Sequence, residues 1–407
     1  MSLPQPKVEI GFDLTDRPNS PFFTLDDSLR GRLDNSDYRL GGFIFFDVTD
    51  RARGFSSNRG RPSQFSTFPA GQVTIELNNH DRAFDPLYTA SPFFGNIIPR
   101  RQMRVSFGDY RVFTGWIEDW DLNYTPDGDS TVTAIAYDAF YIVANQNLAE
   151  FTPSVQTADE RINTILDRPG VNWSTDLRDL EVSDQNMGAY QVDADTNALQ
   201  YIQKIAESEP GEVFVNKDGA ISFTNRLKYP QSAGLVTIGE NGISFDSLRV
   251  IYGAEELYNE VTVSRLTGGT AIASDISSQN EYGVRAYSIS DLLVESDDQI
   301  AEIAVEYASR FSQPEYRIEA AEIDMRKPSD TDRNKLFGLE IGDVVNVTFT
   351  PNQIPPAIVK YLEIINIEHL VTTSSHYMTF GFKEITYAPL VLDDEVFGKL
   401  DVGTLSW

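Results

Sequence analysis

The sequence predicts a mainly β, multidomain fold of the α+β type: two antiparallel β-barrel domains, a small α+β domain between them and a short C-terminal arm. Most of the chain consists of strand-like segments separated by Gly, Pro, Asn and Asp turns, which favours β-rich domains. Aromatic residues make up 12% of the chain and suit the packing of sheets. A length of 407 residues exceeds one ordinary core, so two to four domains are expected.

Residues 1–150 are expected to form the first β-barrel domain. Val73, Ile75 and Leu77 alternate with polar residues and predict a strand with one buried face. A second set of strands ends at residues 116–120 (WIEDW). Residues 78–99, called here the aromatic loop, lie between them and are rich in aromatic residues and proline. This loop is longer than a usual structureless connection, which indicates a packed segment or an interface.

Two interpretations of the aromatic loop stay open. Its Asn, Asp and Pro residues can build Asx turns, and Arg82 can bridge Asp81 or Asp85, which would make the loop a structural corner. A calcium loop is not expected, because the alternating oxygen ligands and the central Gly are missing. Alternatively, the loop is a subunit or partner contact that exposes its large apolar side chains. These are Phe84, Leu87, Tyr88, Phe93 and Phe94.

Residues 151–240 are expected to form the small α+β domain. A helix is predicted over 157–168, where Thr157 can cap and Glu160 follows three residues later. A second helix is predicted from 195 or 196 to 209 and is stopped by Pro210 and Gly211. Residues 212–215 and 220–223 then predict a hairpin around an Asn-Lys-Asp-Gly turn.

Residues 241–390 are expected to form the second β-barrel domain. It includes a helix over 296–312, with Ser296 as its cap and an apolar stripe that recurs every three or four residues. Pro314 ends that helix. Residues 391–407 are too few for a domain, and we expect an extended C-terminal arm whose Trp407 can dock on a neighbour.

An internal repeat supports the presence of two related barrels. Three segments of the first half match three of the second in order and pattern: 103–107 with 345–349, 116–120 with 366–370, and 131–135 with 377–381. Alternation alone can produce such matches, because antiparallel strands share a period of two. If the repeat is structural, three chains would present six related barrels, which would match a six-fold tube.

The order of strand, aromatic loop and second strand set resembles minor tail proteins of long-tailed phages that infect actinobacteria. The resemblance is densest over about residues 50–145, with residues 79–86 (NHDRAFDP) at the turn. In particular, it resembles the hub that closes the distal end of the tail tube. It implies a structural virion protein, assembled in the host cytoplasm into the phage tail tip. The implied form is a homotrimer in which each chain has two tube-like β-barrel domains with inserted α+β domains.

The same resemblance implies the partners of such a hub. These are the distal tail ring protein and the tail tube, the tape-measure protein, and other tail-tip or fibre proteins. Viral DNA would be met only in transit, during DNA ejection. Nothing in this sequence resembles a fused peptidase, lysozyme or long fibre, so wall-degrading or receptor-binding roles are expected in other tail proteins.

The net charge of −28 is distributed unevenly. Residues 1–150 hold 14 basic and 20 acidic residues, whereas residues 151–407 hold 19 and 41. Such an acidic surface repels the phosphates of nucleic acids and disfavours DNA binding. It can serve solubility alone. It would also suit the wall of a conduit that DNA crosses without adhering.

One basic cluster stands out against this acidity, and we call its members Arg51, Arg53, Arg59 and Arg61 the arginine row. Three interpretations stay open. The row is a solvated loop, or it meets an acidic surface on a neighbouring subunit or on the tube. In the third, it binds nucleic acid, since Arg, Gly and Phe are interleaved there.

The sequence predicts no enzyme and no cofactor. It has no cysteine and three histidines, His80, His369 and His376, each expected to be structural. No nucleophile elbow, zinc-helix or phosphate-loop motif is present. Neither a signal peptide nor a membrane anchor is expected, because the start lacks a basic segment and no apolar run approaches about 20 residues.

Two alternative functions stay open. The chain could be a receptor- or carbohydrate-binding tail module that stacks a saccharide on Trp116, Trp120 or Tyr88. It could also be the adjacent distal tail ring protein, a hexamer that usually has one barrel. The repeated barrel argues against the ring protein.

Overall fold

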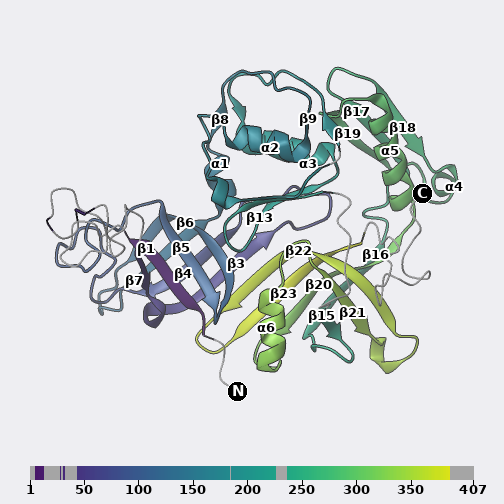
Figure 1. Ribbon diagram of the computed structural model, residues 1–407. Helices are drawn as coiled ribbons and strands as arrows, with labels where there is room; N and C mark the ends of the chain where they lie inside the picture. The colour runs from purple at the N-terminus through teal and green to yellow at the C-terminus, as the bar shows by residue number, and fades with distance from the viewer. Residues whose placement is uncertain are drawn as a thin grey trace.

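The computed structural model describes residues 5–12, 28, 31–32, 44–183, 185–225 and 236–385. The chain is mostly β, comprises several structural units, and is built around one large and mainly antiparallel sheet (Figure 1). This confirms the mainly β, multidomain fold class. The predicted arm 391–407, with Trp407, lies outside the described residues.

The first half of the large sheet has the strand order β3-β4-β7-β6-β5-β1-β2. All of these pairs are antiparallel. In β4, Val73, Ile75 and Leu77 are fully buried and the residues between them are not, as the alternation predicts. The strands are β1 (Lys7–Phe12), β2 (Ile44–Asp47), β3 (Ala52–Gly60), β4 (Gln72–Asn78), β5 (Arg101–Phe107), β6 (Tyr110–Asn123) and β7 (Thr131–Tyr137).

The second half has the order β16-β20-β23-β22, and β22 also pairs with β21. A short strand, β15, lies parallel to β21. The two halves form one sheet because β22 pairs with β3. The strands are β15 (Val236–Gly239), β16 (Ser247–Gly253), β20 (Glu315–Asp324), β21 (Val344–Phe349), β22 (Ile358–Val371) and β23 (His376–Glu384), with helix α6 (Asp330–Gly338) between β20 and β21.

The registers of the strands relate the two halves. Strands β5, β6 and β7 form an antiparallel meander, and so do β21, β22 and β23. The pairing of β6 with β7 skips Glu118, and that of β22 with β23 skips Ile365. When these two bulges are superposed, Met103 corresponds to Val345 and Ile135 to Gly381, as the repeat predicts. The middle segment differs, because 116–120 corresponds to 363–367 and not to 366–370.

An α+β unit follows β7. Thr157 and Glu160 form the expected capping box of α2, and Asn197 caps α3 by accepting from the N–H of Gln200. In the hairpin after α3, the Asn216 side chain accepts from two backbone N–H groups, and Gly219 has a φ of 87°. The elements are α1 (Ala139–Val143), β8 (Asn147–Leu148), β9 (Gln156–Thr157), α2 (Ala158–Leu166), β10 (Arg178–Leu180), β11 (Asn186–Met187), β12 (Thr196–Asn197), α3 (Ala198–Ser208), β13 (Glu212–Val215) and β14 (Ile221–Thr224).

A second inserted unit lies between β16 and β20. Its three-stranded sheet, β18-β17-β19, and its helix α5 share an apolar cluster that is separate from the main core. The predicted helix 296–312 is α5, and Ser296 caps it together with Gln299. The prediction did not separate this small sheet from the barrel. The elements are β17 (Glu260–Arg265), β18 (Thr270–Ser274), α4 (Ile276–Tyr282), β19 (Ala286–Leu292) and α5 (Asp297–Phe311).

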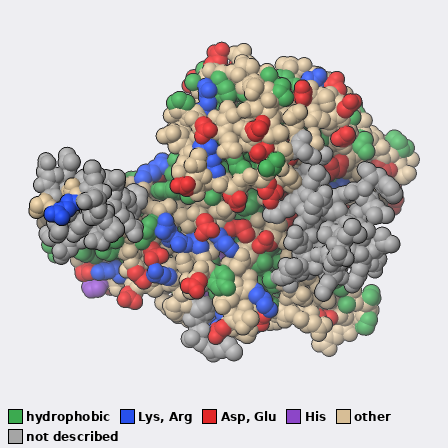
Figure 2. All heavy atoms as spheres, in the orientation of Figure 1, with side chains coloured by type: hydrophobic (Ala, Val, Ile, Leu, Met, Phe, Trp, Pro, Cys, Tyr) green, Lys and Arg blue, Asp and Glu red, His purple; other side chains and the backbone are tan. Residues whose placement is uncertain are grey.

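Both inserted units lie on the same side of the large sheet (Figure 1). They contact each other through the Tyr190 hydroxyl, which donates to the Val294 carbonyl at 2.9 Å, and the Ser208 hydroxyl, which accepts from Leu293 N–H at 2.8 Å. On the face shown in Figure 2, Lys and Arg side chains gather over the first half of the sheet, whereas Asp and Glu side chains spread over the inserted units.

Candidate assembly surfaces

The aromatic loop is a corner held by its own polar side chains. Asn79 accepts from Phe84 N–H at 2.9 Å. The buried Asp85 carboxylate accepts from Leu87 N–H, from Arg82 and from the Tyr124 hydroxyl, each at 2.8 Å. Burial alone would raise the pKa of Asp85, but these hydrogen bonds hold it below its ordinary value. The local sequence therefore builds the Asx-type corner that was one of its two interpretations.

The aromatic side chains of this loop divide into a buried and an exposed set. Phe84 is fully buried and stacks on Phe93 at 5.4 Å, and Phe93 in turn stacks on Phe12 at 4.5 Å. This corrects the expectation that Phe84 and Phe93 are exposed, because both belong to the core. Phe94 is 44% exposed, and Tyr88 is half-buried beneath the Arg82 guanidinium. The exposed large hydrophobic side chains of the loop are Leu87, Phe94 and Ile98.

The tryptophans suggested for saccharide stacking are engaged within the chain. Trp120 stacks on Phe84 at 5.9 Å and donates its indole N–H to the Ile98 carbonyl at 3.1 Å. Trp116 meets Trp173 edge-on at 5.6 Å. A sugar platform needs an open ring face, so these contacts weaken the carbohydrate interpretation.

The arginine row pairs with carboxylates of its own chain. Arg51 binds Asp81 through two hydrogen bonds of 2.8 Å, and Arg53 pairs with Asp129. The Arg51 contact lowers the pKa of Asp81 to about 2. Both pairs are at the surface, where an ion pair stabilises by about 1 kcal/mol or less.

The other two arginines of the row are in the interior. Arg59, 4% exposed, binds Glu340 at 2.8 Å and so ties β3 to the second half of the sheet. Arg61 pairs with Glu212 of β13 and lies over the Phe68 ring at 4.7 Å. The row is therefore no simple solvated loop, since two of its members join three units of one chain.

Glu212 and Arg61 belong to a four-charge network. Lys383 lies 2.6 Å from Glu212 and 3.1 Å from Glu363. Burial alone would raise the pKa of Glu212, but the positive charges of Arg61 and Lys383 outweigh the effect of burial and lower the pKa of Glu212 to about 2. Burial raises the pKa of Glu363 to about 7, with Glu212 repelling a second negative charge. Glu212 is therefore the ionised member of the pair, and Glu363 is the one that keeps its proton toward neutral pH.

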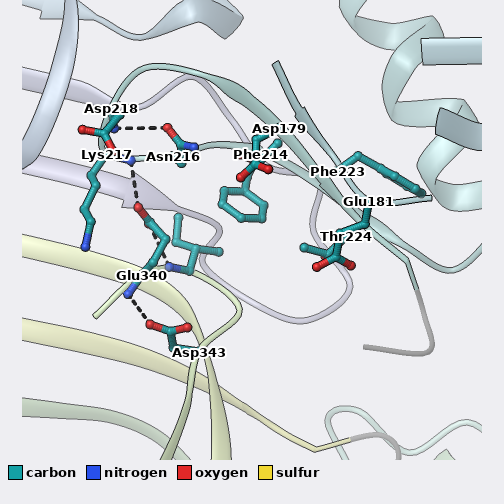
Figure 3. Close-up of a pocket in the computed structure, with 12 residues that line it drawn as sticks. Asp179, Glu181, Phe214, Asn216, Lys217, Asp218, Phe223, Thr224, Glu340 and Asp343 are labelled. Carbon is teal, nitrogen blue, oxygen red and sulfur yellow. Dashed lines mark hydrogen bonds between the residues drawn. The ribbon is translucent and has the colours of Figure 1, made fainter. Parts of the chain in front are cut away.

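A pocket of about 210 Å³ lies where the β13–β14 hairpin meets the segment before β21 (Figure 3). One oxygen of the Glu340 carboxylate accepts from Lys217 N–H, and the other from Arg59 and Ile341 N–H, all at 2.8 Å. The space is smaller than the roughly 300–1,000 Å³ of ordinary ligand pockets. We therefore interpret it as a structural joint. Its other acidic side chains are Asp179, Glu181, Asp218 and Asp343.

The histidines occupy structural positions. His369 and His376 are buried with their ring nitrogens 3.2 Å apart, and the His376 ring stacks on Phe107 at 4.7 Å. Burial lowers the pKa of His376 to about 3. His80 contacts the Asn78 side chain at 2.8 Å. In the described ranges, no three His, Asp or Glu side chains are grouped to hold a metal ion. No helix there is long and apolar enough to cross a membrane.

Comparisons with known proteins reveal a shared fold without a shared sequence. No protein-family model matches the chain, and neither does any curated protein. Solved structures do match. The chain has the fold of phage tail proteins. A tail protein from Neisseria meningitidis superposes with a TM-score of 0.60 at 10% identity, covering 84% of this chain and 94% of that one.

Two further structures extend the fold likeness. The 43 kDa tail protein of prophage MuSo2 from Shewanella oneidensis gives a TM-score of 0.55 at 14% identity, over 85% of this chain and 96% of that chain. The E. coli c3393 protein gives 0.50 at 11% identity, over 82% and 73%. That protein is described as a type VI secretion component similar to the T4 tail proteins gp27 and gp5.

Proposed function

We propose that this chain is a structural protein of a phage tail: the trimeric hub that closes the distal end of the tail tube. The shared fold over more than four fifths of the chain supports the tail assignment. The sequence resemblance over about residues 50–145 supports the finer assignment to long-tailed phages of actinobacteria.

The observation that carries this proposal is the pair of related half-sheets joined side by side through β22 and β3. Three chains would present six such halves, which would match a six-fold tube on one side and a three-fold tip on the other. A hexameric ring protein with one barrel would have no use for the second half.

The aromatic loop is our proposed contact with the distal tail ring protein or the tube. Leu87 is 83% exposed, and Phe94 and Ile98 are 44% and 46% exposed on the same loop. Because the corner beneath them is fixed by buried phenylalanines, these side chains would be held in place before the partner arrives. Tyr88, Arg51 and Arg53 would border this contact, whereas Arg59 and Arg61 would act from the interior.

The acidic C-terminal two-thirds of the chain, residues 151–407, would border the channel. A wall with a net charge of −22 over residues 151–407 would not hold DNA phosphates during passage. The tape-measure protein would occupy this channel first, and other tip or fibre proteins would attach at the open end. We propose no catalytic role, and we retain the division into units 1–150, 151–240 and 241–390 with a terminal arm, except that β15 pairs with β21 and so belongs with the third unit.

Light scattering after size exclusion tests this proposal. A mass near three times 45.6 kDa is expected. A hexamer would indicate the ring protein instead. A protein that stays monomeric both alone and on isolated tail tubes would refute the hub. Phage lacking this protein should produce tails without a closed tip, and tails of normal length with a normal tip would equally refute the proposal.

A further inference from the structure

We infer that two copies of this chain join by pairing β16 of one copy with the C-terminal part of β6 in the next. The register would be the one by which β3 pairs with β22 inside the chain. This inference rests on the proposed trimer, and it adds which strands meet and which residues lie opposite one another.

The internal joint provides the template. β3 and β22 are antiparallel, with Gly60 opposite Asn366 and Phe55 opposite Val371. Asn58 lies at its centre, donating to Glu368 at 2.9 Å and accepting from Asn366 at 3.1 Å. The joint is tight: a Cβ on Gly60 would lie 2.2 Å from the Ile365 carbonyl oxygen.

Strand β16 is the counterpart of β3. In the first half β3 pairs with β4, and β4 pairs with β7, the last strand of the meander. In the second half β16 pairs with β20, and β20 pairs with β23, again the last strand of the meander. Tracing these registers places Leu248 where Phe55 stands in the first half. Counting along the strands, Gly253 falls at the position of Gly60, and both strands end there. The superposed bulges make β6 the counterpart of β22, with Asp119 in the place of Asn366.

Each counterpart presents an edge that no strand of the described residues pairs with. β6 pairs with β5 only as far as Ile117. Beyond that point, over residues 119–123, the edge of β6 that faces away from β7 has no strand partner in the part of the chain that the structure describes. The outer edge of β16 likewise has no described strand beside it. A Cβ on Gly253 would meet nothing within 4 Å, whereas one on Gly60, where φ is 118°, would lie 2.2 Å from the backbone of β22. Exposed strand edges are templates for pairing with another chain.

The side chains on these edges fit each other in the template register. Tyr252, 71% exposed, would lie opposite Trp120, and Val250 opposite Leu122. Aromatic and aliphatic cross-strand pairs stabilise antiparallel sheets. The side chain of Arg249, also 71% exposed, would lie opposite Asn123 and diagonal to Asp121. A second copy is the favoured occupant because one chain carries both halves of a joint that it already forms internally.

Cysteine cross-linking tests the register, since the natural chain has no cysteine. Differently tagged Arg249→Cys and Asn123→Cys chains are mixed and oxidised mildly. We expect a disulfide-linked pair that contains both tags. The control pairs Arg249→Cys with Asp119→Cys, four residues away, where the Cα atoms would be about 13 Å apart and beyond disulfide reach. A trimer that gives no cross-link in the first mixture, or equal cross-linking in both, overturns the inference.

A substitution tests the joint in another way. Gly253→Val adds a side chain where the free chain has open space, so folding should be retained, as unchanged circular dichroism and melting would show. Association should weaken at least tenfold by light scattering. Ser274→Val, which adds the same branched side chain on an exposed strand position of β18, should leave association unchanged.

The outcomes separate this inference from the proposed function. A wild-type trimer that Gly253→Val leaves intact would refute the joint and leave the hub standing. Should the purified chain be monomeric, the cysteine mixtures are examined in assembled tails. Cross-linking there supports the joint, and its absence in tails that contain three copies refutes it. A chain that never becomes trimeric refutes both.

Discussion

Gly60→Ala should break the joint between the two halves of the sheet. The added Cβ would lie 2.2 Å from the Ile365 carbonyl oxygen and 2.5 Å from the Asn366 Cα, both of which are backbone atoms of β22. The φ of Gly60 is 118°, a conformation that costs an L-residue about 1–3 kcal/mol. Forcing the strands apart adds about 1–3 kcal/mol. The free energy of unfolding should therefore fall by roughly 4 kcal/mol.

Gly253→Ala is the matched control, because it adds the same methyl group at the equivalent position of the other half. Nothing lies within 4 Å of its Cβ, so a chain diluted below association should keep its stability or gain up to about 1 kcal/mol from the lost freedom of glycine. Urea unfolding followed by tryptophan fluorescence measures both variants. If Gly60→Ala unfolds within about 1 kcal/mol of Gly253→Ala, the tight β3–β22 joint is refuted.

Three further predictions concern the core and the charge network. Phe84→Ala should lower the free energy of unfolding by about 3–5 kcal/mol, whereas the exposed Leu87→Ala should change it by less than about 0.5 kcal/mol; equal effects in urea unfolding would contradict their placement. Glu212→Gln should cost about 3–5 kcal/mol near pH 7, because Arg61 and Lys383 lose a buried counter-charge; a loss below about 1 kcal/mol would show that the pairing is not formed. Burial raises the pKa of Glu363 from 4.5 in the unfolded state to about 7 in the folded state. Between pH 4.5 and 7 the unfolded state therefore loses this proton more readily than the folded state, and the free energy of unfolding falls as the pH rises. Glu363→Gln should therefore be more stable than the natural chain by about 3 kcal/mol at pH 8 but not at pH 4, and parallel pH profiles would refute the shift.

Local chemistry made several elements predictable from the sequence. Thr157 with Glu160, and Ser296 with its helical stripe, marked the starts of α2 and α5 because caps act within one turn of the helix. The Asn-Lys-Asp-Gly turn marked the β13–β14 hairpin for the same local reason. The alternation in β4 identified the buried face, since side chains of a strand point to opposite sides.

Features that depend on distant partners were not predictable in the same way. The arginine row was correctly identified as a cluster, but its neighbours in the sequence do not indicate its partners. Glu212 lies 151 residues from Arg61, and Glu340 lies 281 residues from Arg59. Phe84 and Phe94 have the same local chemistry, and only the packing of Phe12 and Trp120 around the corner decides which is buried. The small sheet of β17, β18 and β19 was missed because its strands alternate like those of the barrel around it.

The middle strand of the repeat was misaligned by three residues for a physical reason that also bears on assembly. The internal joint uses backbone hydrogen bonds and ends at Gly60, and the proposed joint would do the same with Gly253, so side chains along the two could differ. Asn58 and Glu368 at the internal joint correspond to Ile251 and Asp121 at the proposed one. Sequence matching sees only these side chains, whereas the bulges at Glu118 and Ile365 fix the true register. Pairing between strand edges constrains the backbone but not the side chains. If both edges find a partner, such joints would therefore preserve the backbone geometry of the repeat while its side chains diverge.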